Sequence, residues 1–62
     1  MNKEDRAAFL RWIATASEAQ LEGSLVRLEA LRAILRDEGA RADSHTLAQW
    51  LNAELEARRS IR

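Results

Sequence analysis

The fold expected for this chain is determined by residues 18–38, EAQLEGSLVRLEALRAILRDE. Leucines recur in this stretch at intervals of three and four residues, which places them along one side of an α-helix. Such a pattern is typical of a helix that packs one apolar side against a protein core. We call this side the leucine face, and its members are Leu21, Leu25, Leu28, Leu31 and Leu35. The sequence therefore predicts one long helix over residues 18–38.

The opposite side of the same helix is also apolar, but most of its residues are small. We call it the small-residue face, and its members are Ala19, Gly23, Val26, Ala30 and Ala33. Alanine is the best helix former, so one interpretation leaves these positions idle in water. Gly23 favours a packed face instead, because glycine inside a helix costs about 1 kcal/mol relative to alanine. Val26 favours it too, as a large apolar residue outside the leucine face. We therefore expect a second helix to cover this side.

The composition predicts a small all-α domain that spans residues 1–62. The chain has no proline and two glycines, and no segment alternates apolar and polar residues as a half-buried strand does. It has no cysteine and one histidine, which excludes disulfides and leaves too few ligands for a zinc site. A core this small usually needs very regular helix packing or association with another chain.

A first helix is predicted over residues 3–15. Asn2 is a favoured N-cap residue, and the acidic residues that follow it lie where the helix dipole favours negative charge. Phe9, Trp12 and Ile13 share one side of this helix, which we interpret as a core face. Trp12 has an indole N–H that needs a partner, so it is also a candidate for an interface.

The first helix is expected to end in a tight turn at residues 15–17. Thr15 with Glu18, or Ser17 with Gln20, has the spacing of a capping box at the start of the next helix. The alternative is one uninterrupted helix, since no glycine or proline forces a turn here. We prefer the turn, because a helix of about 36 residues would be long for a small domain.

The middle helix is expected to stop at Gly39, the residue type that most often follows the last helical turn. Residues 39–43, GARAD, then form a loop. This assignment leaves a local conflict, because Asp37 and Glu38 would lie at the negative end of the helix dipole.

A third helix is predicted over residues 45–59, with Asp43 or Ser44 as its N-cap. Glu54 and Arg58 have the i, i+4 spacing of a surface salt bridge. The alternative places this pair between two packed helices, where it fixes their register. The apolar residues of the third helix fall on two adjoining sides, with Leu47, Leu51 and Leu55 on one and Trp50, Ala53, Ala57 and Ile61 on the other.

Together these elements predict a small three-helix bundle, or a helical hairpin, with a long central helix. The first and third helices are expected to pack antiparallel to the middle one on its leucine face. We predict that the small-residue face is covered in a symmetric homodimer, where the two middle helices approach closely. The alternative is a monomer in which the first or third helix covers that face.

The charge balance gives no reason to expect nucleic acid as a partner. Ten basic and ten acidic side chains cancel, whereas non-specific nucleic-acid binding depends on a basic surface. The alternative hypothesis is a DNA-binding transcriptional regulator, because residues 28–51 have the helix, loop and helix of a helix-turn-helix. Ser44, His45 and Gln49 would then begin the recognition helix, although lysine and arginine are missing from its first turns.

The sequence contains no pattern that indicates catalysis. A glycine-rich phosphate loop, a nucleophile motif and paired histidine ligands are all missing, so we expect no enzyme, no cofactor, no metal site and no small-molecule substrate. The N-terminus MNKEDRAAF resembles neither a signal peptide nor a membrane span, and a chain with one lysine is a poor match to a membrane-surface helix. The lack of cysteine fits a cytoplasmic protein.

The remaining function class is a small helical protein-interaction module. We predict that the chain is a homodimer that binds another protein through packed helix faces, as a regulator, an adaptor, an antitoxin or a phage-type inhibitor of a host protein. Tryptophan is enriched among the residues that dominate interface energies, so Trp12 and Trp50 are the expected anchors. The predicted interface residues are Trp12, Ala19, Gly23, Val26, Ala30, Ala33 and Trp50.

Overall fold

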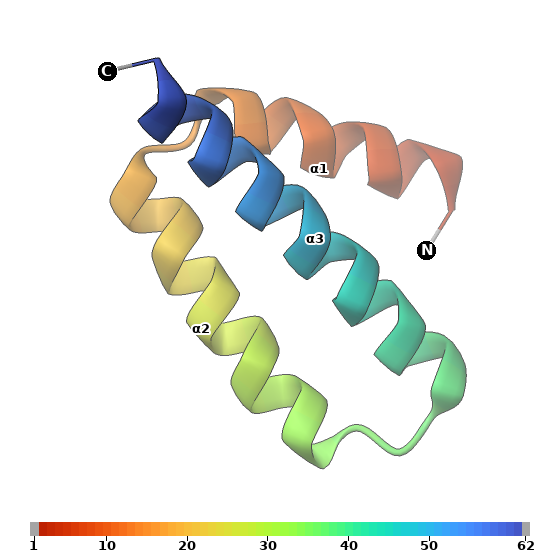
Figure 1. Ribbon diagram of the computed structural model, residues 1–62. Coiled ribbons are helices and arrows are strands. Elements are labelled where there is room, and N and C mark those ends of the chain that lie inside the picture. The colour runs from red at the N-terminus through yellow and green to blue at the C-terminus, as the bar shows by residue number, and fades with distance from the viewer. Residues whose placement is uncertain (1, 62) are drawn as a thin grey trace.

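The computed structural model describes residues 2–61 and folds them into three α-helices (Figure 1). These helices are α1 (Lys3–Thr15), α2 (Glu18–Ile34) and α3 (Glu38–Ser60). No strand occurs among the described residues. The all-α class and the three-helix architecture are therefore confirmed.

The N-terminus of α1 lies where the sequence predicts it. The side chain of Asn2 accepts a hydrogen bond from the backbone N–H of Asp5 at 2.8 Å, which satisfies a donor that has no partner inside the helix. Glu4 and Asp5 occupy the first turn, where the positive end of the helix dipole stabilises their charge. The predicted bounds, residues 3–15, match those observed.

A capping box at Ser17 separates α1 from α2. The Ser17 hydroxyl accepts from the N–H of Gln20 at 3.1 Å, and the Gln20 amide oxygen accepts from the N–H of Ser17 at 2.8 Å. These reciprocal bonds satisfy two backbone donors at the start of α2. The predicted turn is thus confirmed, the uninterrupted helix is wrong, and the box uses Ser17 with Gln20 and not Thr15 with Glu18.

The second connection differs from the prediction. Helix α2 ends at Ile34 and α3 begins at Glu38, so residues 39–43 are the first turns of α3 and not a loop. The N-cap of α3 is Asp37, whose carboxylate accepts from the N–H of Ala40 at 2.8 Å. Gly39 does not adopt the left-handed conformation that stops a helix. Asp43 and Ser44 lie inside α3, so neither is its N-cap.

The physical reason for this shift is the pair of acidic residues before Gly39. At the end of α2 they would meet the negative end of its dipole, whereas at the start of α3 they meet the positive end. Asp37 is also among the strongest N-cap residue types. The local conflict in the sequence is resolved by moving the helix boundary.

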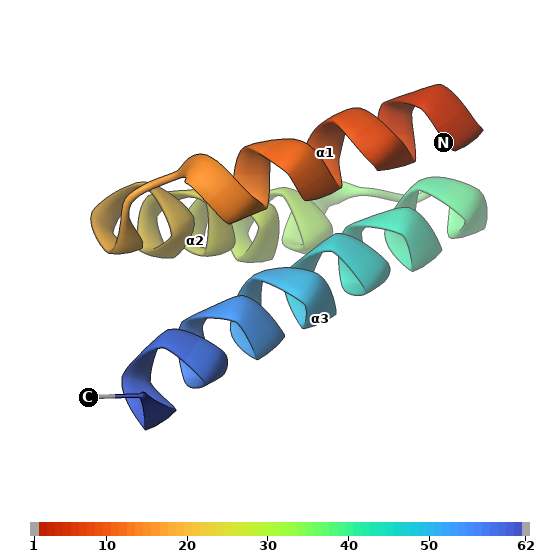
Figure 2. The same cartoon turned by 90° about the horizontal axis from the view of Figure 1, so that it is seen from above.

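Helix α3 is the longest, with 23 residues against 17 in α2, so the prediction of a longest middle helix is wrong. Most contacts between helices join α2 to α3, and α3 also packs against α1. Helix α2 runs opposite to both α1 and α3, as predicted (Figure 1). Seen from above, α1 and α3 run in the same general direction, and α2 is seen behind them and between them (Figure 2).

The core lies where the three helices meet near the turn between α1 and α2. It contains two leucines that are wholly buried, Leu21 in α2 and Leu51 in α3. Ile13 contributes from α1, Ala16 from the C-cap of α1, and Leu55 from α3. From this core α1 and α2 diverge, so the C-terminal part of α2 faces α3 but not α1 (Figure 1).

Candidate protein-interaction surface

The end of α1 is held by an arginine from the far end of the chain. Arg58 in α3 donates from Nη1 to the carbonyl oxygen of Ala16 at 2.6 Å and from Nη2 to that of Ile13 at 2.8 Å. Carbonyl groups at a helix C-terminus have no partner inside the helix, so the guanidinium satisfies two of them. Its Nε donates to Glu54 at 3.1 Å, which orients the guanidinium. The pair Glu54–Arg58 therefore acts between helices and is more than a surface salt bridge.

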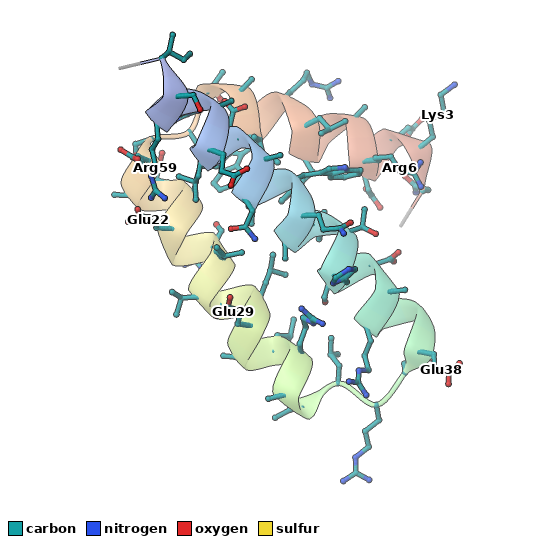
Figure 3. All side chains as sticks on the ribbon, in the orientation of Figure 1. Lys3, Arg6, Glu22, Glu29, Glu38 and Arg59 are labelled. Carbon is teal, nitrogen blue, oxygen red and sulfur yellow. The ribbon has the colours of Figure 1, made fainter. Side chains whose placement is uncertain are left out.

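The next residue, Arg59, joins α3 to the start of α2. Its Nε lies 3.1 Å from a carboxylate oxygen of Glu18, and its Nη2 lies 2.6 Å from one of Glu22. Figure 3 shows Arg59 and Glu22 facing each other across the two helices. Arg58 and Arg59 are thus both engaged with other residues of the chain, and neither belongs to an unpaired basic patch.

The two tryptophans predicted as partner anchors belong to one aromatic cluster. Phe9 lies between them, with ring centroids 5.9 Å from Trp12 and 6.2 Å from Trp50. All three side chains are half-buried and pack against the core. They therefore help to hold α1 against α3, and their role as partner anchors stays a prediction.

The small-residue face is uncovered along the whole of α2. All of its five residues are exposed, and Val26 retains 65% of its accessible surface. A methyl group built on Gly23 would meet no atom within 4 Å. The alternative in which α1 or α3 covers this face within one chain is therefore wrong. The structure leaves open to solvent a helix side that has no charged residue among its five members.

The leucine face is only partly buried. Leu21 is wholly buried, and Leu25, Leu28 and Leu35 are half-buried, but Leu31 is 44% exposed. One turn further on, Ile34 is 73% exposed. Leu31 lines the space between α1 and α2, where α3 alone does not cover it, and Ile34 is the last residue of α2.

An open apolar groove occupies the space between the diverging helices. We call it the α1–α2 groove, and its lining residues are Phe9, Ser24, Arg27, Leu28 and Leu31. Its volume is about 220 Å³, and it opens to solvent. Arg27 is exposed at its edge and donates from Nη2 to the Ser24 hydroxyl at 3.3 Å. No ion pair joins Arg27 to a carboxylate of residues 2–61.

Sequence reasoning placed Leu31 on the core face and missed this groove. The periodicity correctly puts Leu31 on the same side as Leu21, but it does not show how far α1 follows that side. The available signal was Ile34, a large apolar residue at the end of α2 that falls on neither face.

The segment proposed as a helix-turn-helix has a different geometry. Residues 28–51 form most of an antiparallel hairpin of α2 and α3, joined by residues 35–37. Ser44, predicted at the start of a recognition helix, lies within α3 and is buried. No helix therefore begins near residues 44 and 45, where the base-contacting helix start is expected.

Other functional features are few in the part of the chain that the structure covers. Among residues 2–61, no helix combines the length and apolarity needed to cross a bilayer, and no cluster of three or more histidine, cysteine or acidic side chains is arranged to hold a metal ion. Comparison with known proteins finds no family model, no curated protein and no solved structure that matches the chain.

Proposed function

We propose that this protein is a non-enzymatic protein-interaction module that acts as a homodimer, with the small-residue face of α2 as the interface between the two copies. As part of the same proposal it works in the cytoplasm, where a chain without cysteine is ordinary. It would act on another protein as a regulator, an adaptor, an antitoxin or a phage-type inhibitor of a host protein.

The exposure of the small-residue face is the observation that carries this proposal. Helix α2 already packs against α3 on its leucine face, and it still presents a continuous apolar side to water. Burying Val26 alone is worth about 1.5 kcal/mol, since that is the usual gain for a valine side chain taken out of water. Alanine and glycine around it allow a second helix to approach closely.

A second copy of the chain is the natural occupant of such a face. In a two-fold symmetric dimer the same patch serves both partners, so a face without charge meets a face without charge. Its five residues span most of α2, which at about 1.5 Å per residue is roughly 25 Å long. A core as small as this one gains from an additional apolar contact of that length.

Sedimentation of a charged variant tests the dimer. Ala30→Arg places a long cationic side chain in the middle of the face, and we expect it to convert a dimer to a monomer without loss of helicity in circular dichroism. The matched control is Ala53→Arg, which changes an exposed alanine of α3 and should leave the mass unchanged. A wild-type chain that sediments as a monomer at millimolar concentration contradicts the proposal.

Cross-linking gives the orientation of the two copies, because the chain has no cysteine of its own. Val26 is the central residue of the face, so Val26→Cys should form a disulfide with its mate in a parallel or an antiparallel pair. Ala19→Cys should do so only in the parallel pair. Failure of Val26→Cys to cross-link faster than Ala53→Cys argues against this interface.

A further inference from the structure

We propose that the α1–α2 groove docks an amphipathic helix of a partner protein, which places large apolar side chains in the groove and a carboxylate beside Arg27. This inference rests on the proposed function, because it names the kind of partner that the module binds. It concerns a different flank of α2 from the small-residue face, so the two can be tested separately.

The groove combines apolar walls with the guanidinium of Arg27, which makes no ion pair with another residue of the described range 2–61. Phe9 and Leu28 form its half-buried sides, and Leu31 contributes a side chain that is 44% exposed. Arg27 stands at the edge with a neutral hydroxyl, that of Ser24, as its hydrogen-bond partner. A carboxylate is the complement of a guanidinium, and such a pair beside an apolar contact gives a partner both register and selectivity.

The dimensions suit side chains of a helix more than a free small molecule. Pockets for small ligands usually enclose about 300–1,000 Å³, whereas this groove holds about 220 Å³ and is open to solvent. Exposed apolar residues continue past the groove to Ile34. Residues 24–34 of α2 cover about 15 Å at about 1.5 Å per residue, which is close to three turns of a docked helix.

A second copy of the chain does not supply the required face. Outside α2, the large apolar side chains that are exposed among residues 2–61 are Leu10 and Ile61, which lie at opposite ends of the chain. Neither has a second exposed large apolar residue beside it, and Ile61 lies beyond the last residue of α3. In α2 the exposed large residues are Val26, which the proposed dimer buries, and Leu31 and Ile34, which belong to the groove and its continuation. A heterologous partner with several apolar residues in one helical row fits better.

Two synthetic helical peptides test the proposal. Both have leucine at positions i, i+3, i+4 and i+7, and they differ only in the residues that flank this row, glutamate in one and lysine in the other. We expect the acidic peptide to shift the nuclear magnetic resonance signals of Phe9, Leu28 and Leu31 in the labelled protein. We expect it to bind about tenfold more tightly than the basic peptide, since the swap replaces an attraction at Arg27 by a repulsion.

Charge reversal supplies the decisive control. Arg27→Glu should invert the peptide preference, whereas Arg11→Glu, the same change at an exposed arginine of α1 outside the groove, should preserve it. Leu31→Ser should weaken the acidic peptide about tenfold, and Val26→Ser on the small-residue face should not.

The outcomes separate this inference from the dimer. Binding of the acidic peptide to Ala30→Arg as tightly as to the wild type supports a groove that works independently of the dimer. Equal binding of both peptides, no binding, or shifts confined to the small-residue face would overturn the inference while leaving the dimer intact. Groove signals that move with protein concentration alone would assign the groove to a second copy and also overturn it.

Discussion

Arg58 and Ala16, which are 42 residues apart in the sequence, are joined by a hydrogen bond of 2.6 Å from Nη1 to the backbone carbonyl oxygen. The bond lies at the C-terminal end of α1, where it satisfies a backbone carbonyl group. It also holds the last turns of α3 against this end of α1. The core beneath it is small, with five buried residues in its main cluster. A polar contact at this site therefore contributes noticeably to holding the end of α1 against α3.

Arg58→Ala should lower the free energy of unfolding by about 2 kcal/mol, because it leaves two helix-end carbonyls without their charged donor. For a chain of this size that corresponds to a fall in Tm of roughly 8–16 °C. Thermal denaturation followed by circular dichroism measures it. Arg59→Ala is the control, since its side chain is 53% exposed and surface ion pairs are worth under about 1 kcal/mol. Equal losses in the two variants would show that the carbonyl bonds contribute little.

The start of α3 yields a second prediction. Asp37→Ala should cost about 1 kcal/mol and speed amide exchange over residues 38–43, because it removes the N-cap bond to Ala40. Ser44→Ala should cost much less, since Ser44 lies inside α3 and caps no helix end. Hydrogen exchange of the two variants distinguishes the observed boundary from a start near residue 45. A larger loss in Ser44→Ala would favour the later start.

The predicted and observed helix ends show which features of this fold follow from local sequence patterns. The bounds of α1 and the turn at Ser17 were predicted because capping bonds are made by residues close in sequence, such as Ser17 with Gln20. The predicted start of α3 is wrong because glycine is more typical of the position after a helix, although it is tolerated in the first turn and the acidic pair is favoured there. The acidic pair Asp37 and Glu38 conflicts with a helix end at Gly39, and this conflict is the signal in the sequence that favours the observed boundary.

Features that depend on tertiary packing are harder to predict from the sequence. Helical periodicity identified both faces of α2, but it does not show that α1 diverges and leaves Leu31 exposed. The sequence favours a surface salt bridge for Arg58 over a role between helices, because its contacts with Ile13 and Ala16 span more than 40 residues and leave no local pattern. The tryptophans were recognised as special, but nothing local shows that Phe9 joins them into one cluster.

Phe9 is the subject of a third prediction, because it contacts both tryptophans and also lines the groove. Phe9→Ala should lower the free energy of unfolding by about 2 kcal/mol, less than for a wholly buried ring because Phe9 is half-buried. Tryptophan emission should shift to longer wavelength as water reaches the indoles. Phe9→Leu retains most of the apolar volume and should recover over half of the loss. Unchanged emission in Phe9→Ala would show that the indoles do not depend on this ring.

Gly23 supports a fourth prediction, which links stability to assembly. In a monomer Gly23→Ala should raise the free energy of unfolding by about 0.5–1 kcal/mol, because alanine is the better helix former and its methyl group meets nothing within 4 Å. The measurement is made in the Ala30→Arg background, where we expect the chain to be monomeric. In the wild-type background the gain should be smaller at high protein concentration, because the added methyl group separates two helices that approach closely. An equal gain in the free energy of unfolding in both backgrounds would indicate that nothing packs on Gly23. A loss of that free energy in both backgrounds would mean that Gly23 is more crowded than the structure of one chain shows.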